Sequence, residues 1–146
     1  MIVKTILGNI SNYDTKGKAI DNVKVAPDDR LKHILRLVSD SGVEIGVSLD
    51  GGHFHNGDVL AENDEKIFVV ECLPQNVILI KPKDIMQMGF VAHSIGNRHM
   101  PAVFEDGFMI VEDDYLIAEW LDDNHIDYEK TQKVLRHALK HASHHH

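Results

Sequence analysis

Residues 76–101, "NVILIKPKDIMQMGFVAHSIGNRHMP", carry the strongest local structure signals in the chain. An apolar run that ends at Pro82 is typical of a buried strand, because proline cannot donate to a sheet ladder. Asp84 can then cap a helix, and Gln87 three residues later completes a capping box. The core-facing stripe of this helix is expected from four residues with helical spacing, namely Ile85, Met88, Ala92 and Ile95. The stretch therefore predicts a strand followed by a helix.

The pattern downstream predicts two short strands, a second helix and a last strand. "AVFED" and "FMIVED" are strand candidates joined by Asp106 and Gly107, a frequent hairpin turn. Asp113 or Asp114 can cap the helix, and its apolar face is expected from Leu116, Ile117, Trp120 and Leu121. A final strand is expected around "HIDYEK". The order is thus β-α-β-β-α-β, the ferredoxin-like split βαβ arrangement.

Residues 1–73 show a β-rich pattern instead. Short apolar runs such as "MIVKTILG", "SGVEIGVSL", "GDVLAEN" and "DEKIFVVECL" alternate with turn formers such as "DGGHFHNGD". "PDDRLKHILRLV" can open with one helical turn, although Arg36 to Ser39 favours a strand. Pro74 marks a boundary. We therefore predict an α+β protein with an N-terminal β-rich domain at 1–74, the ferredoxin-like domain at 75–133 and a His-rich C-terminal tail at 134–146.

The composition narrows the class of protein. The formal net charge of -8, without a Lys/Arg cluster, argues against nucleic-acid binding. No apolar run approaches the roughly 18 residues of a membrane helix and no signal-peptide pattern opens the chain, so we expect a cytoplasmic protein without a membrane partner. Cys72 is the only cysteine, so a bound metal needs nitrogen or oxygen ligands. The eleven histidines are the unusual feature, and five of them lie between His137 and His146.

The end of the first predicted helix has an ordinary structural explanation. Gly96 or the asparagine after it can take the left-handed conformation that satisfies the last helical carbonyls. Arg98 then lies favourably at the negative end of the helix dipole. His99 follows just beyond the helix end, where its side chain is expected to be exposed.

The same residues carry a family resemblance. "IGNRHMP", preceded by His93, resembles the motif of the UreE family of urease accessory proteins, which are nickel metallochaperones. The likeness extends over nearly the whole chain, through "MIVKTILGNI", "EIGVSL", "GDVL" and "VILIKPKDIMQMGFVAH" to the histidine-bearing C-terminus. It implies an N-terminal domain similar to peptide-binding domains of chaperones, a ferredoxin-like metal-binding domain, and a homodimer formed through the latter.

The resemblance also implies a metal ligand at His99, at the dimer interface. A two-fold axis presents each residue twice, so two copies of His99 can share one ion, with water or tail residues completing the shell. The implied cargo is Ni²⁺ for the urease active site, although Zn²⁺ or Cu²⁺ also suits imidazole. The implied partners are the urease apoprotein and the urease accessory proteins, including the family's GTPase. No enzymatic activity is expected.

The tail offers further ligand candidates. His137, His141, His144 and His145 have helical spacing, and either a helix or a flexible chain can present them to an ion. The final "HHH" is equally typical of an expression-tag remnant, a doubt that mostly spares His137 and His141.

Other candidates have a structural explanation beside the functional one. His93 either supports the metal site or packs on the helix. His53 and His55 share a face if extended, but a solvated loop is favoured, and His33 is expected on the surface. Met86 and Met88 are expected to pack in the core. The stretch "VEDDY" offers only carboxylate ligands, from Glu112, Asp113 and Asp114. Any accessory metal site there is therefore oxygen-based or missing.

Two other functions compete with the nickel chaperone. A peptide-binding or assembly module would use exposed strand edges of the N-terminal half, with metal incidental. A metal-dependent hydrolase is disfavoured, because the sequence has no His-Glu-x-x-His helix, no P-loop and no evident nucleophile with a base.

Overall fold

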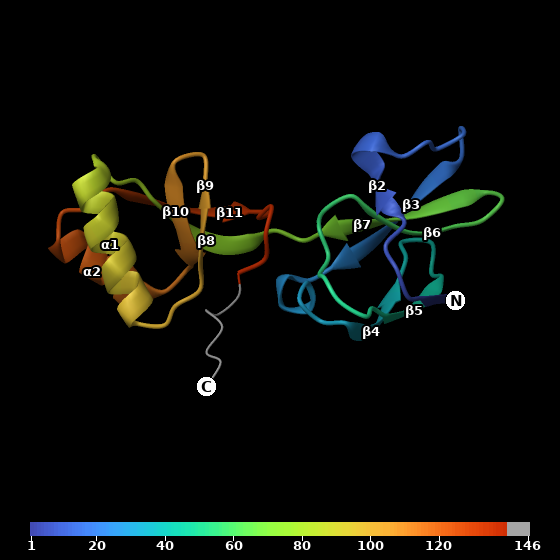
Figure 1. Cartoon of the computed structure of the whole chain (residues 1–146), viewed down its shortest axis with the longest axis horizontal. Helices are drawn as coiled ribbons and strands as arrows, with labels where there is room; N and C mark the ends of the chain where they lie inside the picture. The colour runs from blue at the N-terminus through green and yellow to red at the C-terminus, as the bar shows by residue number, and fades with distance from the viewer. Residues whose placement is uncertain (140–146) are drawn as a thin grey trace. The chain divides into compact units, whose positions relative to one another are not determined.

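The computed structural model describes residues 1–139, which form two compact units, one from Met1 to Pro74 and one beginning at Gln75 (Figure 1). Among the described residues, no helix has the length and apolar character needed to cross a membrane. The described part of the chain is of the mixed α+β class, with mostly strands and two α-helices.

The first unit consists of two sheets and two single-turn 3-10 helices. The three-stranded sheet has the order β1-β5-β4, with β1 at Ile2–Val3, β5 at Glu44–Ser48 and β4 at Ile34–Val38. The four-stranded sheet has the order β2-β6-β7-β3, with β2 at Gly8–Asn9, β6 at Asp58–Glu62, β7 at Lys66–Cys72 and β3 at Ala19–Val25. The 3-10 helices are η1 at Ile10–Asn12 and η2 at Pro27–Asp29.

Strand β3 is an element that the sequence pattern fails to predict. It pairs in parallel with β7 along its whole length, beginning with Ala19 opposite Lys66. Its buried face includes Asp21, which is only 6% exposed, whereas the side chain of Ile20 is 49% exposed. The apolar alternation of a half-buried strand is therefore broken at its start. The opening run "MIVKTILG" also differs from the expected single strand, since β1 and β2 belong to different sheets.

The second unit has the element order β-α-β-β-α-β. Its elements are β8 (Gln75–Ile80), α1 (Ile85–Asn97), β9 (Ala102–Glu105), β10 (Phe108–Glu112), α2 (Tyr115–Asp123) and β11 (Tyr128–Lys133). They form one sheet of order β11-β8-β10-β9, in which every neighbouring pair is antiparallel. Asp106 and Gly107 both have positive φ, which is the backbone of the predicted two-residue hairpin turn.

Both helices pack on one face of this sheet, as Figure 1 shows. The buried cluster between them consists of Ile78, Ile80, Val91, Ile95, Met109, Val111, Ile117, Ala118, Leu121 and Ile126. Three residues expected in the core are instead exposed: Ile85 (84%), Met86 (80%) and Leu116 (53%). All three lie in the first turn of a helix. Helical spacing identifies a stripe but does not show how far along the helix the sheet extends beneath it.

The opposite face of the sheet is covered by the residues that follow β11. Leu135 is fully buried against Val77 and Ile110, and Leu139 packs on the same cluster. The described part of the expected tail, residues 134–139, thus belongs to the second unit and packs on its sheet.

Candidate metal centre

Helix α1 leads into the turn that holds the predicted ligand, His99. At the start of the helix, the Asp84 carboxylate accepts a hydrogen bond from the backbone N–H of Gln87 at 2.8 Å. The reciprocal bond of a capping box is displaced by one residue, because Gln87 Oε1 accepts from the N–H of Lys83 at 2.9 Å. The start of the helix is therefore held by its own side chains.

The end of α1 differs from the expected glycine cap. The helix continues through Gly96 to Asn97, Arg98 is the C-cap with φ -85°, and His99 takes the left-handed conformation with φ 57°. The backbone N–H of His99 donates to the carbonyl oxygen of Gly96 at 3.0 Å. Histidine tolerates this region better than β-branched residues do, and the left-handed residue lies three positions after Gly96.

The His99 side chain is exposed, as predicted. Its neighbour Arg98 is directed toward α2, where the guanidinium carbon lies 5.6 Å from the centre of the Trp120 ring. Trp120 in turn stacks on Phe90, with ring centres 5.6 Å apart. A cation-π contact and a ring stack therefore tie the turn that presents His99 to the second helix.

His93 lies on the exposed side of α1, one turn before Asn97. The Asn97 side-chain amide lies 3.2 Å from His93 Nε2. Because the amide nitrogen donates, Nε2 accepts and the proton of the neutral ring is on Nδ1. This hydrogen bond orients the His93 ring along the helix surface.

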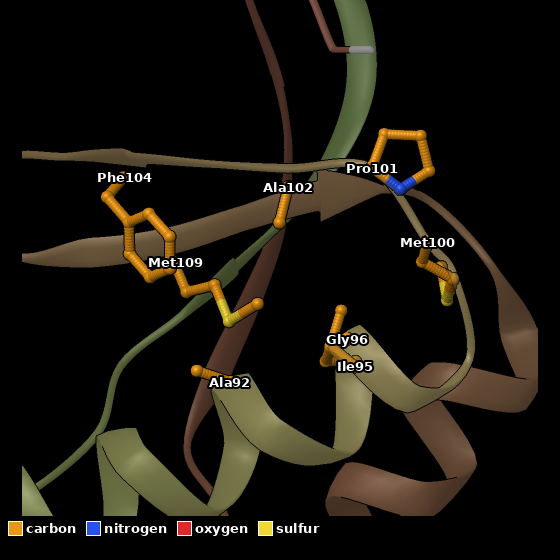
Figure 2. A pocket seen from close by; sticks show the side chains of 8 residues that line it. All are labelled: Ala92, Ile95, Gly96, Met100, Pro101, Ala102, Phe104 and Met109. Atoms are coloured by element: carbon orange, nitrogen blue, oxygen red, sulfur yellow. The ribbon is translucent and has the colours of Figure 1, made fainter. Parts of the chain in front are cut away.

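An apolar groove lies beside the turn that contains His99 (Figure 2). Its volume is about 250 Å³, and it is lined by Ala92, Ile95, Gly96, Met100, Pro101, Ala102, Phe104 and Met109. Met100 and Pro101 lie at one end and Phe104 at the other, with α1 along one side. Phe104 is 60% exposed, so the groove continues into an apolar surface.

The histidine candidates of the tail divide between described and undescribed residues. His137 is exposed and lies in a bend, not in a helix. His141, His144 and His145 lie outside the described residues.

Two of the acidic residues of "VEDDY" have structural roles. Asp114 caps α2, because its carboxylate accepts from the N–H groups of Leu116 at 2.8 Å and Ile117 at 3.3 Å. Asp113 forms an ion pair with Lys130 at 3.5 Å.

The thiol of Cys72 is not a ready metal ligand. The residue is only 2% exposed, and burial raises the pKa of its thiol. A protonated thiol is a poor ligand, so the candidate donors are imidazoles and carboxylates.

His53 and His55 are not the freely solvated pair that was expected. Both are half-buried, and their ring centres lie 4.5 Å apart. The alternation His53-Phe54-His55 is the sequence feature that could have predicted this closeness, because it puts both imidazoles on one side of an extended segment.

Comparison with known families supplies a match over both units. Residues 3–73 match the family model described as "UreE urease accessory protein, N-terminal domain", and residues 75–146 match the corresponding C-terminal domain.

Individual relatives match over the whole chain. A urease accessory protein UreE of Bacillus cereus is 43% identical over 151 residues, covering 100% of this chain and 99% of the relative. Those of Geobacillus kaustophilus and Ureaplasma urealyticum are 42% and 37% identical, and the alignments cover 100% and 97% of this chain and 99% and 97% of those proteins.

Proposed function

This chain belongs to the UreE family of urease accessory proteins, which are not enzymes, and from that premise we propose that it binds Ni²⁺ and delivers it for maturation of the urease active site. The family supports a role in urease maturation. The nickel cargo, the site residues and the dimer are the proposal.

The observation that carries the proposal is the position of His99. Its imidazole is exposed, on a left-handed residue that follows the C-cap of α1. One imidazole is too few ligands for an ion. A symmetric homodimer that brings two copies of this turn together offers two, from one residue type at one position.

The groove beside His99 supports an interface at this face. Apolar side chains line it, and the exposed ring of Phe104 extends it outward. Burying such a surface against a second copy is favourable by about 25 cal/mol per Å² of apolar area. We infer that the two-fold axis passes near this groove.

A pair of imidazoles leaves coordination positions open, which favours transfer over storage. We propose that His137, His141, His144 and His145 supply further ligands, and that His93 orients or supports the site. Imidazole also accepts Zn²⁺ and Cu²⁺, so the choice of nickel rests on the family.

The finer fold assignments belong to the same proposal. We infer that the second unit is ferredoxin-like, which its β-α-β-β-α-β order and its antiparallel β11-β8-β10-β9 sheet support. We infer that the first unit resembles peptide-binding domains of chaperones. The proposed partners are urease apoprotein and the other accessory proteins, including their GTPase, in the cytoplasm.

A matched pair of substitutions tests the metal site. His125 follows α2 as His99 follows α1, and both are left-handed, with φ 55° and 57°. Asparagine tolerates this conformation, so His99→Asn and His125→Asn remove an imidazole with similar backbone effects.

We expect calorimetric titration of tag-free protein with NiCl₂ to show one tight ion per two chains. His99→Asn should abolish this site and His125→Asn should keep it, with light scattering reporting the dimer in each case. An unchanged tight stoichiometry in His99→Asn would refute the metal assignment.

A second function, an assembly module without a metal role, is favoured by one surface of the first unit. A groove of about 400 Å³ crosses the β1-β5-β4 sheet, lined by Ile2, Ile34, Leu35, Arg36, Gly46, Val47 and Ser48. Ile2 and Ile34 are 72% and 79% exposed, as is common where a protein partner binds.

Ile34→Lys separates the two functions. A loss of urease activation with nickel binding intact would favour the assembly module. Unchanged activation in Ile34→Lys, with loss in His99→Asn, would favour the nickel chaperone.

A further inference from the structure

The loop "GGHFHNG", residues 51–57, holds two imidazoles close together in the first unit. Phe54 is fully buried and lies between them in sequence, so its neighbours His53 and His55 project to the other side. The two rings are 4.5 Å apart between centres and tilted by 42°. One nitrogen of each ring lies within 4.8 Å of the other.

The backbone of this loop is fixed by hydrogen bonds to other segments of the unit. The N–H of Phe54 donates to the carbonyl of Arg30 at 3.0 Å, and Arg30 Nε donates back to the carbonyl of Phe54 at 3.3 Å. His33 Nε2 donates to the carbonyl of Gly52 at 2.7 Å. The imidazoles are therefore held close together before any ligand binds, which lowers the entropic cost of binding one.

Asp58 fixes the backbone at His55 and supplies negative charge near its ring. Its Oδ2 accepts from the backbone N–H of His55 at 2.7 Å and lies 3.9 Å from His55 Nδ1. The buried guanidinium of Arg30 is the opposing charge, and both groups act electrostatically on Cys72. These opposite charges offset each other, so the imidazole nitrogens are the main attraction for a cation.

We propose that His53 and His55 form a second metal site, which binds one late first-row divalent ion per chain. An ion needs about 2.0–2.1 Å to each imidazole nitrogen, so the nitrogens must lie within about 4.2 Å of each other. A small rotation of one ring brings a separation of up to 4.8 Å into this range. Water fills the remaining positions, so this site binds more weakly than one completed by protein ligands.

The site is independent of the proposal at His99. All of its residues lie in the first unit, and it needs no second copy of the chain. Its stoichiometry is one ion per chain, whereas the shared His99 site takes one ion per two chains. Failure of either assignment therefore leaves the other testable.

The test uses the full chain with His99, His141, His144, His145 and His146 replaced by asparagine, and CuCl₂ as the probe. Cu²⁺ binds imidazole most strongly among the divalent ions of the series, and it broadens the nuclear resonances of its ligands. We expect the ring signals of His53 and His55 to broaden together at less than one equivalent of Cu²⁺. Calorimetry should show one ion per chain.

Substitutions identify the ligands. The double variant His53→Gln, His55→Gln should no longer bind the one Cu²⁺ ion per chain. Either change alone should weaken Cu²⁺ binding about a hundredfold, because the chelate is lost. His125→Asn in the same background is the control and should keep the equivalent. The same NMR titration of the unsubstituted chain covers the case in which a variant fails to fold.

Two outcomes overturn the assignment. One is that the double glutamine variant still binds one Cu²⁺ ion per chain. The other is broadening of only one of the two rings, which would indicate ordinary binding to a single surface histidine.

Discussion

His99 combines two demands in one residue, a left-handed backbone and an exposed imidazole, as His125 does after α2. Glycine would satisfy the first demand and lose the ligand. Histidine satisfies both at a modest cost in backbone energy. Substitutions at this position can therefore test the backbone energy and the loss of the imidazole ligand separately.

We expect His99→Val to lower the free energy of unfolding of the metal-free protein by about 1–2 kcal/mol, because a branched side chain is strained at positive φ. His99→Asn should change it by less than half of that. Urea unfolding with chelator present measures both. Equal unfolding energies for the two variants would mean that the turn relaxes away from the left-handed conformation.

Asp21 shows how a buried carboxylate on β3 is kept ionised. Burial acts to raise its pKa, but hydrogen bonds from the side chains of Ser41 and Ser39, the backbone N–H of Ser41 and the charge of Lys66 together hold the pKa below its ordinary value. The ammonium of Lys66 lies 3.8 Å from the carboxylate. A lowered pKa in the folded state stabilises the fold above the unfolded pKa, and this contribution is lost as pH falls through the folded value.

We therefore expect Ser41→Ala to destabilise the protein at pH 7 by about 1.5–3 kcal/mol, the usual contribution of a hydrogen bond to a charged group. The difference from the unsubstituted protein should shrink in acid, once Asp21 is protonated in both. Urea unfolding at several pH values between 7 and 2.5 gives this difference directly. A difference that does not change with pH would exclude the Asp21 carboxylate as its source.

The segment 134–139 shows that a short stretch without regular structure can be firmly attached. Leu135 is buried in the cluster on the sheet face opposite the helices. The N–H of Arg136 donates to the Glu105 carboxylate at 3.1 Å, and its guanidinium donates to Asp106 at 2.6 Å. The guanidinium lowers the pKa of the exposed Asp106 carboxyl through this hydrogen bond.

We expect Leu135→Ala to detach this segment, because its anchoring side chain is removed. Exchange of the Arg136 amide should accelerate strongly, and the loss in unfolding free energy should not exceed about 3 kcal/mol, since detachment limits the cavity cost. Leu139→Ala is the control, and its effect should be smaller because Leu139 is only partly buried. An Arg136 amide as protected as in the unsubstituted chain would show that polar contacts alone hold the segment.

The sequence predicts the order of elements in the second unit because each carries its own local signal, such as the Asp84 cap or the Asp106-Gly107 turn. It does not predict β3, because that strand is defined by its partner β7 and not by its own pattern. The same limit applies at the metal site. The exposed position of His99 follows from its place after a helix, but the left-handed residue depends on where packing lets the helix end.

The two units have separate buried clusters, so a core substitution in one is expected to act first on that unit. Trp120, the only tryptophan, reports on the second unit alone.

We expect Ile67→Ala to destabilise the first unit by about 2–5 kcal/mol, as loss of a buried isoleucine usually does. Its effect on the unfolding transition seen by Trp120 fluorescence should be small. Amide exchange in β7 follows the first unit during the same denaturant series. Equal shifts by both probes would show that the two units unfold as one.

The parallel pairing of β3 with β7 has a consequence for synthesis of the protein on the ribosome. β3 emerges from the exit tunnel well before its neighbour in the sheet, whose pairing begins only at Lys66. Until then Val23 and Val25, which are fully buried in the finished structure, lie on a strand that lacks its ladder partner β7 and can form only the short bridge from Val23 to Ser39. The nascent chain thus carries a strand without its main ladder partner through much of its elongation. A chain truncated before Cys72 is expected to aggregate.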